Sequence, residues 1–183
     1  MKLDDGKECM CSALAINCLQ LGCFMHNSPR CHCDHENQVW MTKLTNLSPK
    51  KKLRDLVIPG THDSASVTIS KLAPFAAVGM CQNVSVLEQL RRGARYLDLR
   101  IGGKEDSALV DDIVIIHGHL KGAQFPSIVE EVEQFVTDNP GEFVILDVIY
   151  DRNKHDMSPE QRVGVFQLLS STFNHKITQE DAN

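Results

Sequence analysis

Short apolar runs alternate with amphipathic segments along the chain from residue 40 onward. Apolar runs that end at glycine, proline or charged residues predict strands. The predicted strands are 56–58, 95–101, 113–116 and 143–150. A serine three residues before Glu or Gln is typical of a helix N-terminus. The predicted helices begin at Ser85, Ser127 and Ser158, and the second carries an amphipathic apolar stripe over residues 128–136.

This order of strands and helices is typical of a parallel α/β architecture. A barrel and an open doubly wound sheet both fit it, but no glycine-rich phosphate loop follows 56–58, which disfavours a nucleotide-binding sheet. A complete (β/α)8 barrel takes about 250 residues, and residues 38–183 are far fewer. We therefore expect an α/β fold, a TIM-type (β/α) barrel with its first half only in this chain.

The segment 1–37 differs from the rest because it holds six of the seven cysteines. We predict two parts: a Cys-rich, disordered extension over 1–37 and a barrel domain over 38–183. Two alternatives stay open for the extension. Thioacylation would use cysteines beside an apolar stretch, namely Cys9, Cys11, Cys18 or Cys23. Metal binding would use the cluster at 31–35, although it lacks the two-residue spacers of a structural zinc site.

Charge and hydropathy narrow the set of partners. The net charge of −5 and pI of about 5.9 make nucleic acid an unsuitable partner. The basic run 50–54 fits a solvated loop, with a membrane-surface or phosphate contact as the alternative. No apolar stretch reaches the roughly 18 residues of a transmembrane helix, and the N-terminus is a poor secretory signal. We expect a cytoplasmic protein, either soluble or peripherally bound to membrane.

Candidate chemistry is confined to three segments at strand ends, 58–64, 96–100 and 115–119. His62 and His117 come just after predicted strands, where barrel enzymes place catalytic groups. Asp98 and Arg100 lie two residues apart on one strand and point to the same side. Two imidazoles and a guanidinium suit phosphodiester cleavage, because they can move protons and bind phosphoryl oxygens.

Each of these residues also has a purely structural interpretation. A single histidine after a strand is more often an ordinary loop residue than a catalyst. Asp98 and Arg100 can form a structural ion pair. Asp63 can orient a histidine and an arginine. Asp147, inside an apolar strand, either lines the site or caps a neighbouring backbone group.

Four blocks of the chain, in this order, resemble the X domain of the phosphatidylinositol-specific phospholipase C family. The blocks are IPGTHDS at 58–64, QLRRGARYLDLR at 89–100, IHG at 116–118 and PGEFVILD at 140–147. The resemblance covers residues from about 40 to 175. It implies a phosphoric diester hydrolase with an incomplete TIM barrel, acting on inositol phospholipids at a membrane surface.

The resemblance also implies residue roles. His62 would be the general base toward the inositol 2-hydroxyl, and His117 the general acid toward diacylglycerol. Arg100 would bind the phosphate, with Asp63 and Asp98 in support. Asp147 is a weaker substrate-binding candidate. The first product would be inositol 1,2-cyclic phosphate.

Two branches of the family differ in their need for metal. Calcium-dependent members have Asn after the first histidine, an acidic pair on the second strand and a further carboxylate on the fourth. Here these positions hold Asp63, Asp98 with Arg100, and Ile149. The chain resembles the metal-independent branch, so no metal and no cofactor are expected. The alternatives are a metal-dependent glycerophosphodiesterase, which needs a Glu-x-Asp pair, and a catalytically inactive, membrane-peripheral lipid-binding or regulatory protein.

Overall fold

The computed structural model describes residues 37–104, 106–150 and 156–173. Residues 1–36 are not among them, so the expectations for the Cys-rich extension, including thioacylation and zinc binding, lie outside the described residues. The strands are β1 (Gly60–Thr61), β2 (Tyr96–Gly102), β3 (Val114–His117), β4 (Leu120–Gln124) and β5 (Ile145–Tyr150). The α-helices are α3 (Trp40–Leu47), α4 (Ala76–Gly79), α5 (Val86–Arg91), α6 (Phe125–Asp138) and α7 (Pro159–Phe173). Short 3-10 turns, η3 (Leu53–Asp55), η4 (Ser66–Thr68) and η5 (Val110–Asp112), complete the order.

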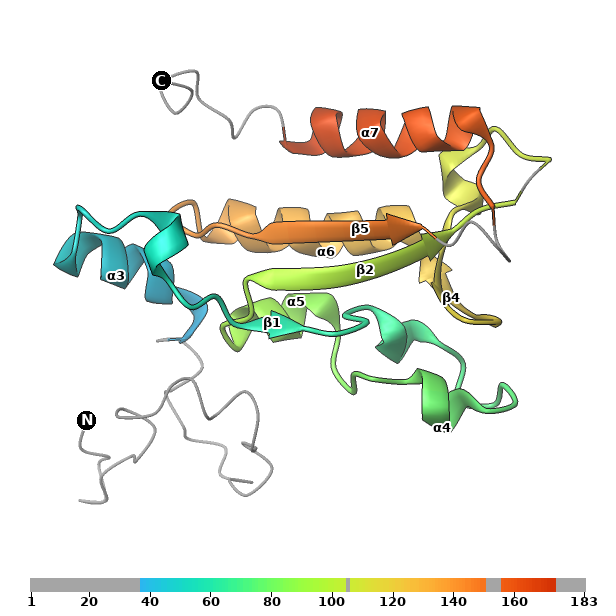
Figure 1. The fold of residues 1–183 in the computed structure, drawn as a ribbon, viewed down its shortest axis with the longest axis horizontal. Coiled ribbons are helices and arrows are strands. Elements are labelled where there is room, and N and C mark those ends of the chain that lie inside the picture. Colours follow the sequence, from blue (N-terminus) through green and yellow to red (C-terminus); the bar gives the residue numbers. More distant parts are fainter. Residues whose placement is uncertain (1–36, 105, 151–155, 174–183) are drawn as a thin grey trace.

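β2 is the central strand of a five-stranded sheet (Figure 1). β1 and β5 pair with it in parallel, and in the second pairing Asp98 lies opposite Asp147. β3 and β4 form a hairpin that is antiparallel to β2. The carboxyl ends of β1, β2 and β5 therefore point the same way, toward the end of the molecule that carries α4 (Figure 1).

The β3–β4 hairpin departs from the parallel architecture that the order of elements predicts. A parallel crossover needs a dozen or more residues and usually a helix, whereas only a loop and η5 separate β2 from β3. The turn between β3 and β4 has two residues, and its Gly118 takes a positive φ of 60°. β4 was not predicted, because its sequence from Leu120 to Gln124 has few apolar residues.

The first strand also differs from its prediction. Residues 56–58 are not in a strand; β1 is the dipeptide that follows Pro59. Proline has no backbone N–H to donate to a ladder, and its carbonyl instead accepts from the backbone N–H groups of Arg95 and Tyr96 at 2.8 and 3.1 Å. Pairing thus continues into β1, directly before His62.

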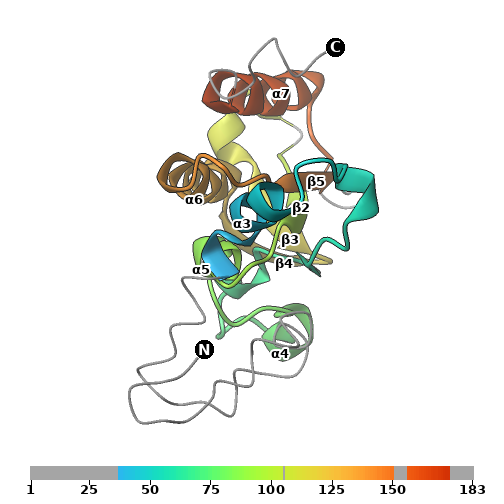
Figure 2. The same cartoon turned by 90° about the vertical axis from the view of Figure 1, so that its left-hand side faces the viewer.

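The core lies between β2 and the helices on one face of the sheet. Leu97, Leu99 and Ile101 are each 0% exposed, as the alternation predicts. They pack in one cluster with the apolar stripe of α6, whose buried members are Ile128, Val129, Val132 and Phe135. Each fully buried side chain of this size contributes roughly 1.5–3 kcal/mol. α5 and α7 flank α6 in the same helical layer (Figure 2).

Two of the three predicted helix starts are confirmed. Ser85 accepts a hydrogen bond from the Glu88 backbone N–H, and Ser158 and Gln161 exchange side-chain-to-backbone bonds in both directions. The third prediction was wrong: α6 begins at Phe125, and the Ser127 hydroxyl donates to the Gln124 carbonyl instead of capping.

The apolar side chains of α7 do not all face the core. Val163 and Phe166 are 55% and 72% exposed, while Leu169 and Phe173 pack against the core. The helix touches α6 and η5 along one side only, so its opposite flank stays in solvent. No helix in the described part of the chain has the length and apolarity needed to cross a bilayer.

A buried ion pair joins the start of β2 to the loop before β5. The side chains of Arg95 and Glu142 are both fully buried, and Arg95 donates to Glu142 Oε2 at 2.6 Å through Nη2 and at 2.9 Å through Nε. Further Arg95 N–H groups donate to the carbonyls of Leu90, Ala94 and Gln38 at 2.6 to 2.7 Å. Burial of this charge is tolerable because it is paired and hydrogen-bonded.

The same pair attaches two helices to the sheet. Glu142 Oε1 accepts from the backbone N–H and the hydroxyl of Thr42 in α3, at 2.9 and 2.7 Å. The Arg95 guanidinium carbon lies 4.6 Å from the ring centroid of Phe135 in α6, a cation–π contact. One ion pair thus holds α3, β2, α6 and the β5 loop together.

Replacing Glu142 by Gln tests this attachment. The substitution leaves the buried Arg95 charge without its counter-ion, so we expect the free energy of unfolding to fall by about 3–5 kcal/mol. Glu88→Gln is the matched control, because Glu88 pairs with Arg92 on an exposed helix face at 2.8 Å, and its loss should cost at most about 1 kcal/mol. Urea denaturation measures both, and equal losses would contradict the role of the buried pair.

Candidate active site

Asp98, on β2, holds the loop after β1 in place. Its Oδ2 accepts from the Asp63 backbone N–H at 3.2 Å and lies 2.9 Å from His62 Nδ1. Its backbone carbonyl accepts from Ser64 N–H at 2.8 Å. One residue thus fixes three consecutive loop positions. The face of β2 opposite the core therefore carries the candidate chemistry, as the alternation predicts.

His62 is the most exposed member of the cluster, with 62% of its side chain in solvent. Its Nδ1 lies 2.9 Å from Asp98 Oδ2 and 3.4 Å from Arg100 Nη2. Arginine can only donate, so we assign the Nδ1 proton to the shorter contact with Asp98. This tautomer leaves Nε2 with a lone pair, 3.3 Å from Asp63 Oδ2.

Asp63 sits in a left-handed backbone conformation, with φ of 46°. Asp and Asn tolerate this region better than other non-glycine residues. Its side chain is only 2% exposed, and its Oδ1 lies 3.0 Å from Arg100 Nε. Oδ1 has no aligned hydrogen bond, so charge attraction, rather than hydrogen-bond geometry, holds this contact.

His117 approaches the cluster from β3. Since β3 is antiparallel to β2, its last residue runs back alongside β2 toward the His62 loop. His117 Nδ1 lies 2.8 Å from the Gly79 carbonyl, which can only accept, and 3.7 Å from Asp63 Oδ2. The proton is therefore assigned to Nδ1, and Nε2 is the ring atom available to a ligand.

Arg100 completes the cluster. Its Nη2 lies 3.2 Å from Asp98 Oδ2, and its side chain is 36% exposed, so it remains accessible to an anion. Burial opposes ionisation of Asp98, but the hydrogen bonds from Arg100 and from Asp63 N–H outweigh it and lower the pKa of this carboxyl below its usual value. The bond to Asp98 likewise raises the pKa of Arg100.

Asp147 lies on the same face, opposite Asp98 across the β2–β5 pair. It accepts a short hydrogen bond from the Tyr96 hydroxyl, and this bond raises the pKa of Tyr96. Both interpretations of Asp147 thus retain a basis: it faces the site side of the sheet and also has a structural partner. The structure brings His62, Asp63, Asp98, Arg100 and His117 into direct contact and leaves Asp147 at the edge of the group.

Cys81 and Gln82 adjoin the cluster, and sequence reasoning did not place them there. Cys81 Sγ lies 3.6 Å from Asp63 Oδ2, and Gln82 Nε2 donates to the His62 carbonyl at 2.9 Å. Burial and the nearby Asp63 charge raise the pKa of the Cys81 thiol. The Ser66 hydroxyl holds the dipeptide by accepting both backbone N–H groups at 3.0 and 3.1 Å. They lie in a loop without periodicity, so no local pattern marks them.

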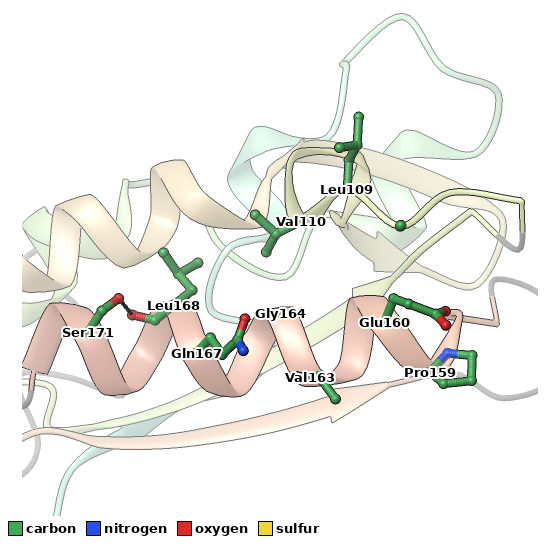
Figure 3. A pocket seen from close by; sticks show the side chains of 10 residues that line it. Leu109, Val110, Pro159, Glu160, Val163, Gly164, Gln167, Leu168 and Ser171 are labelled. Atoms are coloured by element: carbon green, nitrogen blue, oxygen red, sulfur yellow. Dashed lines mark hydrogen bonds between the residues drawn. The ribbon is translucent and has the colours of Figure 1, made fainter.

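A separate groove lies between α7 and the segment 108–110 (Figure 3). Aliphatic side chains such as Leu109, Val110 and Leu168 line it, and Glu160 is the one charged residue among its lining residues. None of the cluster residues borders it. The groove therefore lacks the groups needed for acid–base chemistry, and the candidate active site is the open cluster on β2.

The free energy of unfolding should depend on the ionisation of Asp98. Its pKa is lower in the folded chain than in the unfolded chain, so its carboxylate stabilises the fold above about pH 4, and this stabilisation is lost as pH falls through the folded-state value. Asp98→Asn should flatten the fall in unfolding free energy between about pH 5 and pH 2. Urea denaturation at several pH values measures it, with Asp111→Asn as an exposed control. The same slope in Asp98→Asn as in the unaltered chain would contradict this account.

Comparison with known proteins places this chain in a family. The model of the phosphatidylinositol-specific phospholipase C X domain matches residues 56–183. Human PI-PLC X domain-containing protein 2 is 33% identical over 132 residues, covering 61% of this chain and 43% of that protein. The 1-phosphatidylinositol phosphodiesterase of Listeria monocytogenes is 31% identical over 122 residues, covering 64% and 34%. The chain spans less than half the length of these relatives.

Solved structures share the fold. A phosphatidylinositol-specific phospholipase C from Staphylococcus aureus superposes with a TM-score of 0.59 at 22% identity, covering 78% of this chain and 46% of that chain. The Listeria monocytogenes enzyme gives a TM-score of 0.55 at 25% identity. The curved sheet with its single helical layer is thus part of a TIM-type barrel, as expected. Because the family model matches most of this chain, residues 56–183, the chain belongs to the phosphatidylinositol-specific phospholipase C X-domain family.

Proposed function

We propose that this chain carries the acid–base machinery of a metal-independent phospholipase C that cleaves phosphatidylinositol, or a related inositol phospholipid, to diacylglycerol and inositol 1,2-cyclic phosphate. The observation that carries the proposal is the convergence of His62, His117 and Arg100 around the carboxylates of Asp63 and Asp98. Family membership supports phospholipase chemistry in general, and the residue roles are proposed from this geometry.

The proposed first step is an internal transfer. His62 Nε2 takes the proton of the inositol 2-hydroxyl, and that oxygen attacks phosphorus. The bond from phosphorus to the glycerol oxygen breaks, and His117, entering the step as the imidazolium with a proton on each ring nitrogen, gives its Nε2 proton to the leaving oxygen and keeps the proton on Nδ1. Asp98 stabilises the imidazolium that forms at His62, through the contact to Nδ1 at 2.9 Å. Each proton transfer is worth about 10²–10⁴-fold in rate.

Arg100 is proposed to bind the phosphoryl oxygens, which gain charge in the transition state. Asp63 and Asp98 hold its guanidinium from one side, while its 36% exposed surface can accept the phosphate. Its fixed positive charge supports the expectation that turnover needs no metal. Ile149, which pairs with Arg100 across the β2–β5 ladder, offers no carboxylate for a cation there.

A membrane-facing segment is proposed next to His117. Leu72, Phe75 and Val78 are 95%, 83% and 78% exposed. They belong to or border α4, and the carbonyl of Gly79 in the same helix contacts His117. Apolar side chains exposed in this way favour insertion at a bilayer interface. We infer peripheral attachment at this end of the molecule. The basic run 50–54 lies at the opposite end of the sheet, near α3 (Figure 1).

Turnover of phosphatidylinositol vesicles in excess chelator tests the chemistry. We expect formation of inositol 1,2-cyclic phosphate by the chain, and a loss of about 10²–10⁴-fold in kcat for His62→Ala and for His117→Ala. His119→Ala is the matched control, as an exposed histidine of the same turn, and should keep its rate. Lipid binding without product would favour a catalytically inactive lipid-binding protein instead.

Vesicle sedimentation tests the membrane-facing segment. Phe75→Asp should weaken binding to phosphatidylinositol vesicles about ten-fold or more, because a buried aromatic side chain is worth roughly 1.5–3 kcal/mol. Asp also tolerates the left-handed φ of 63° at this position. Phe166→Asp on α7 is the matched control, since Phe166 is 72% exposed on the other side of the molecule. Equal effects of both substitutions would overturn the assignment.

A further inference from the structure

Three different metal-ligand types converge at the edge of the candidate active site. His62, Asp63 and Cys81 each offer one ligand atom, and these three atoms lie within 4.8 Å of one another. We propose that these side chains form a binding site for Zn²⁺ or a similar thiophilic divalent cation, and that the bound ion inhibits the enzyme. The binding part stands on the geometry alone, whereas the inhibition rests on the proposed function.

The spacing fits tetrahedral zinc. With bonds of about 2.0–2.1 Å to nitrogen, 2.0–2.2 Å to oxygen and 2.3 Å to sulfur, a tetrahedral ion separates N from O by about 3.3 Å and O from S by about 3.6 Å. His62 Nε2 lies 3.3 Å from Asp63 Oδ2, and Cys81 Sγ lies 3.6 Å from the same oxygen. Two of the ligand-to-ligand distances therefore already match those of a tetrahedral zinc site.

The surroundings orient two of the ligands as zinc sites require. A zinc-bound histidine usually passes its other ring proton to a carboxylate, and Asp98 Oδ2 lies 2.9 Å from His62 Nδ1. This contact leaves Nε2 unprotonated, 3.3 Å from Asp63 Oδ2. Asp63 is itself fixed, because its side chain is 2% exposed and its Oδ1 faces Arg100. His62 and Cys81 are exposed, so an ion can enter from solvent and keep a water as its fourth ligand.

Charge also favours a cation at this point. With neutral histidines, the two carboxylates of Asp63 and Asp98 outweigh the single charge of Arg100. Zn²⁺ would bind the thiolate of Cys81, and the displaced thiol proton would leave to solvent. The cluster, ion included, is then neutral. The mixed nitrogen, oxygen and sulfur donor set selects zinc-like ions over Ca²⁺ and Mg²⁺, which prefer oxygen ligands.

Inhibition follows from the atom that the ion occupies. The proposed general base acts through the lone pair of His62 Nε2, and a metal bond to that atom removes the base. Added Zn²⁺ should therefore inhibit turnover while Ca²⁺ and Mg²⁺ do not, and a chelator should restore the rate. The bound cation would thus inhibit a reaction that itself needs no metal.

Co²⁺ absorption tests the binding part without any need for turnover. Because six other cysteines precede residue 34, the full chain with those six changed to Ser is the reference protein. It should show a thiolate-to-Co²⁺ charge-transfer band that Zn²⁺ abolishes. Cys81→Ala should remove the band, and Cys81→Ser should remove it while leaving a hydroxyl of similar size. A reference protein that shows no such band would overturn the site.

Zinc titration of activity tests the consequence. Relative to its own rate in chelator, Cys81→Ser should need more than about 100-fold higher Zn²⁺ for half-inhibition, since even loss of a hydrogen-bonding partner to a ligand costs about 10–100-fold in metal affinity. Equal zinc sensitivity of both proteins, or equal inhibition by Ca²⁺, would overturn the inhibitory role. A Co²⁺ band in a chain without turnover would contradict the proposed function and leave the metal site standing.

Discussion

The guanidinium of Arg95 and the carboxylate of Glu142 form a buried ion pair at the amino end of β2. The arrangement of most of the fold depends on this pair. Separating such a pair in a dry interior costs several kcal/mol. The segments that carry the two residues, and the α3 backbone that Glu142 binds, are therefore constrained to one arrangement. The Ile145 backbone N–H donates to the Arg95 carbonyl at 2.7 Å, so the same residue also sets the register of β5 on β2.

Register at one end of β2 determines chemistry at the other. Side chains alternate along a strand, so once Arg95 is fixed, Asp98 and Arg100 must share the face away from α6. Asp98 then binds the loop after β1, because its carboxylate and its backbone carbonyl both accept hydrogen bonds from that loop. The cluster is thus assembled by backbone geometry, and its charged groups are held by neighbours that are themselves fixed. This arrangement keeps two carboxylates and a guanidinium close together.

Much of this arrangement could be predicted from residue patterns. The alternation over 95–101 predicted which side of β2 is buried, and the stripe on 128–136 predicted the inner face of α6. The grouping of His62, Asp98, Arg100 and His117 was expected from their places at strand ends. Local patterns could not predict the antiparallel hairpin that brings His117 back, because direction depends on the connection after β2. Nor could they predict the Arg95–Glu142 pair or the approach of Cys81, since these contacts join positions far apart in the chain.

The left-handed backbone at Asp63 restricts which residue can follow His62 in this chain. At a φ of 46°, glycine, Asn and Asp are the least strained residues. Glycine would lose the carboxylate, which leaves two polar choices for the position after the first histidine. Of these two, this chain has Asp, whose Oδ1 lies 3.0 Å from Arg100 Nε. The backbone at this position thus favours Asn or Asp, and Asp adds a negative charge beside the Arg100 guanidinium.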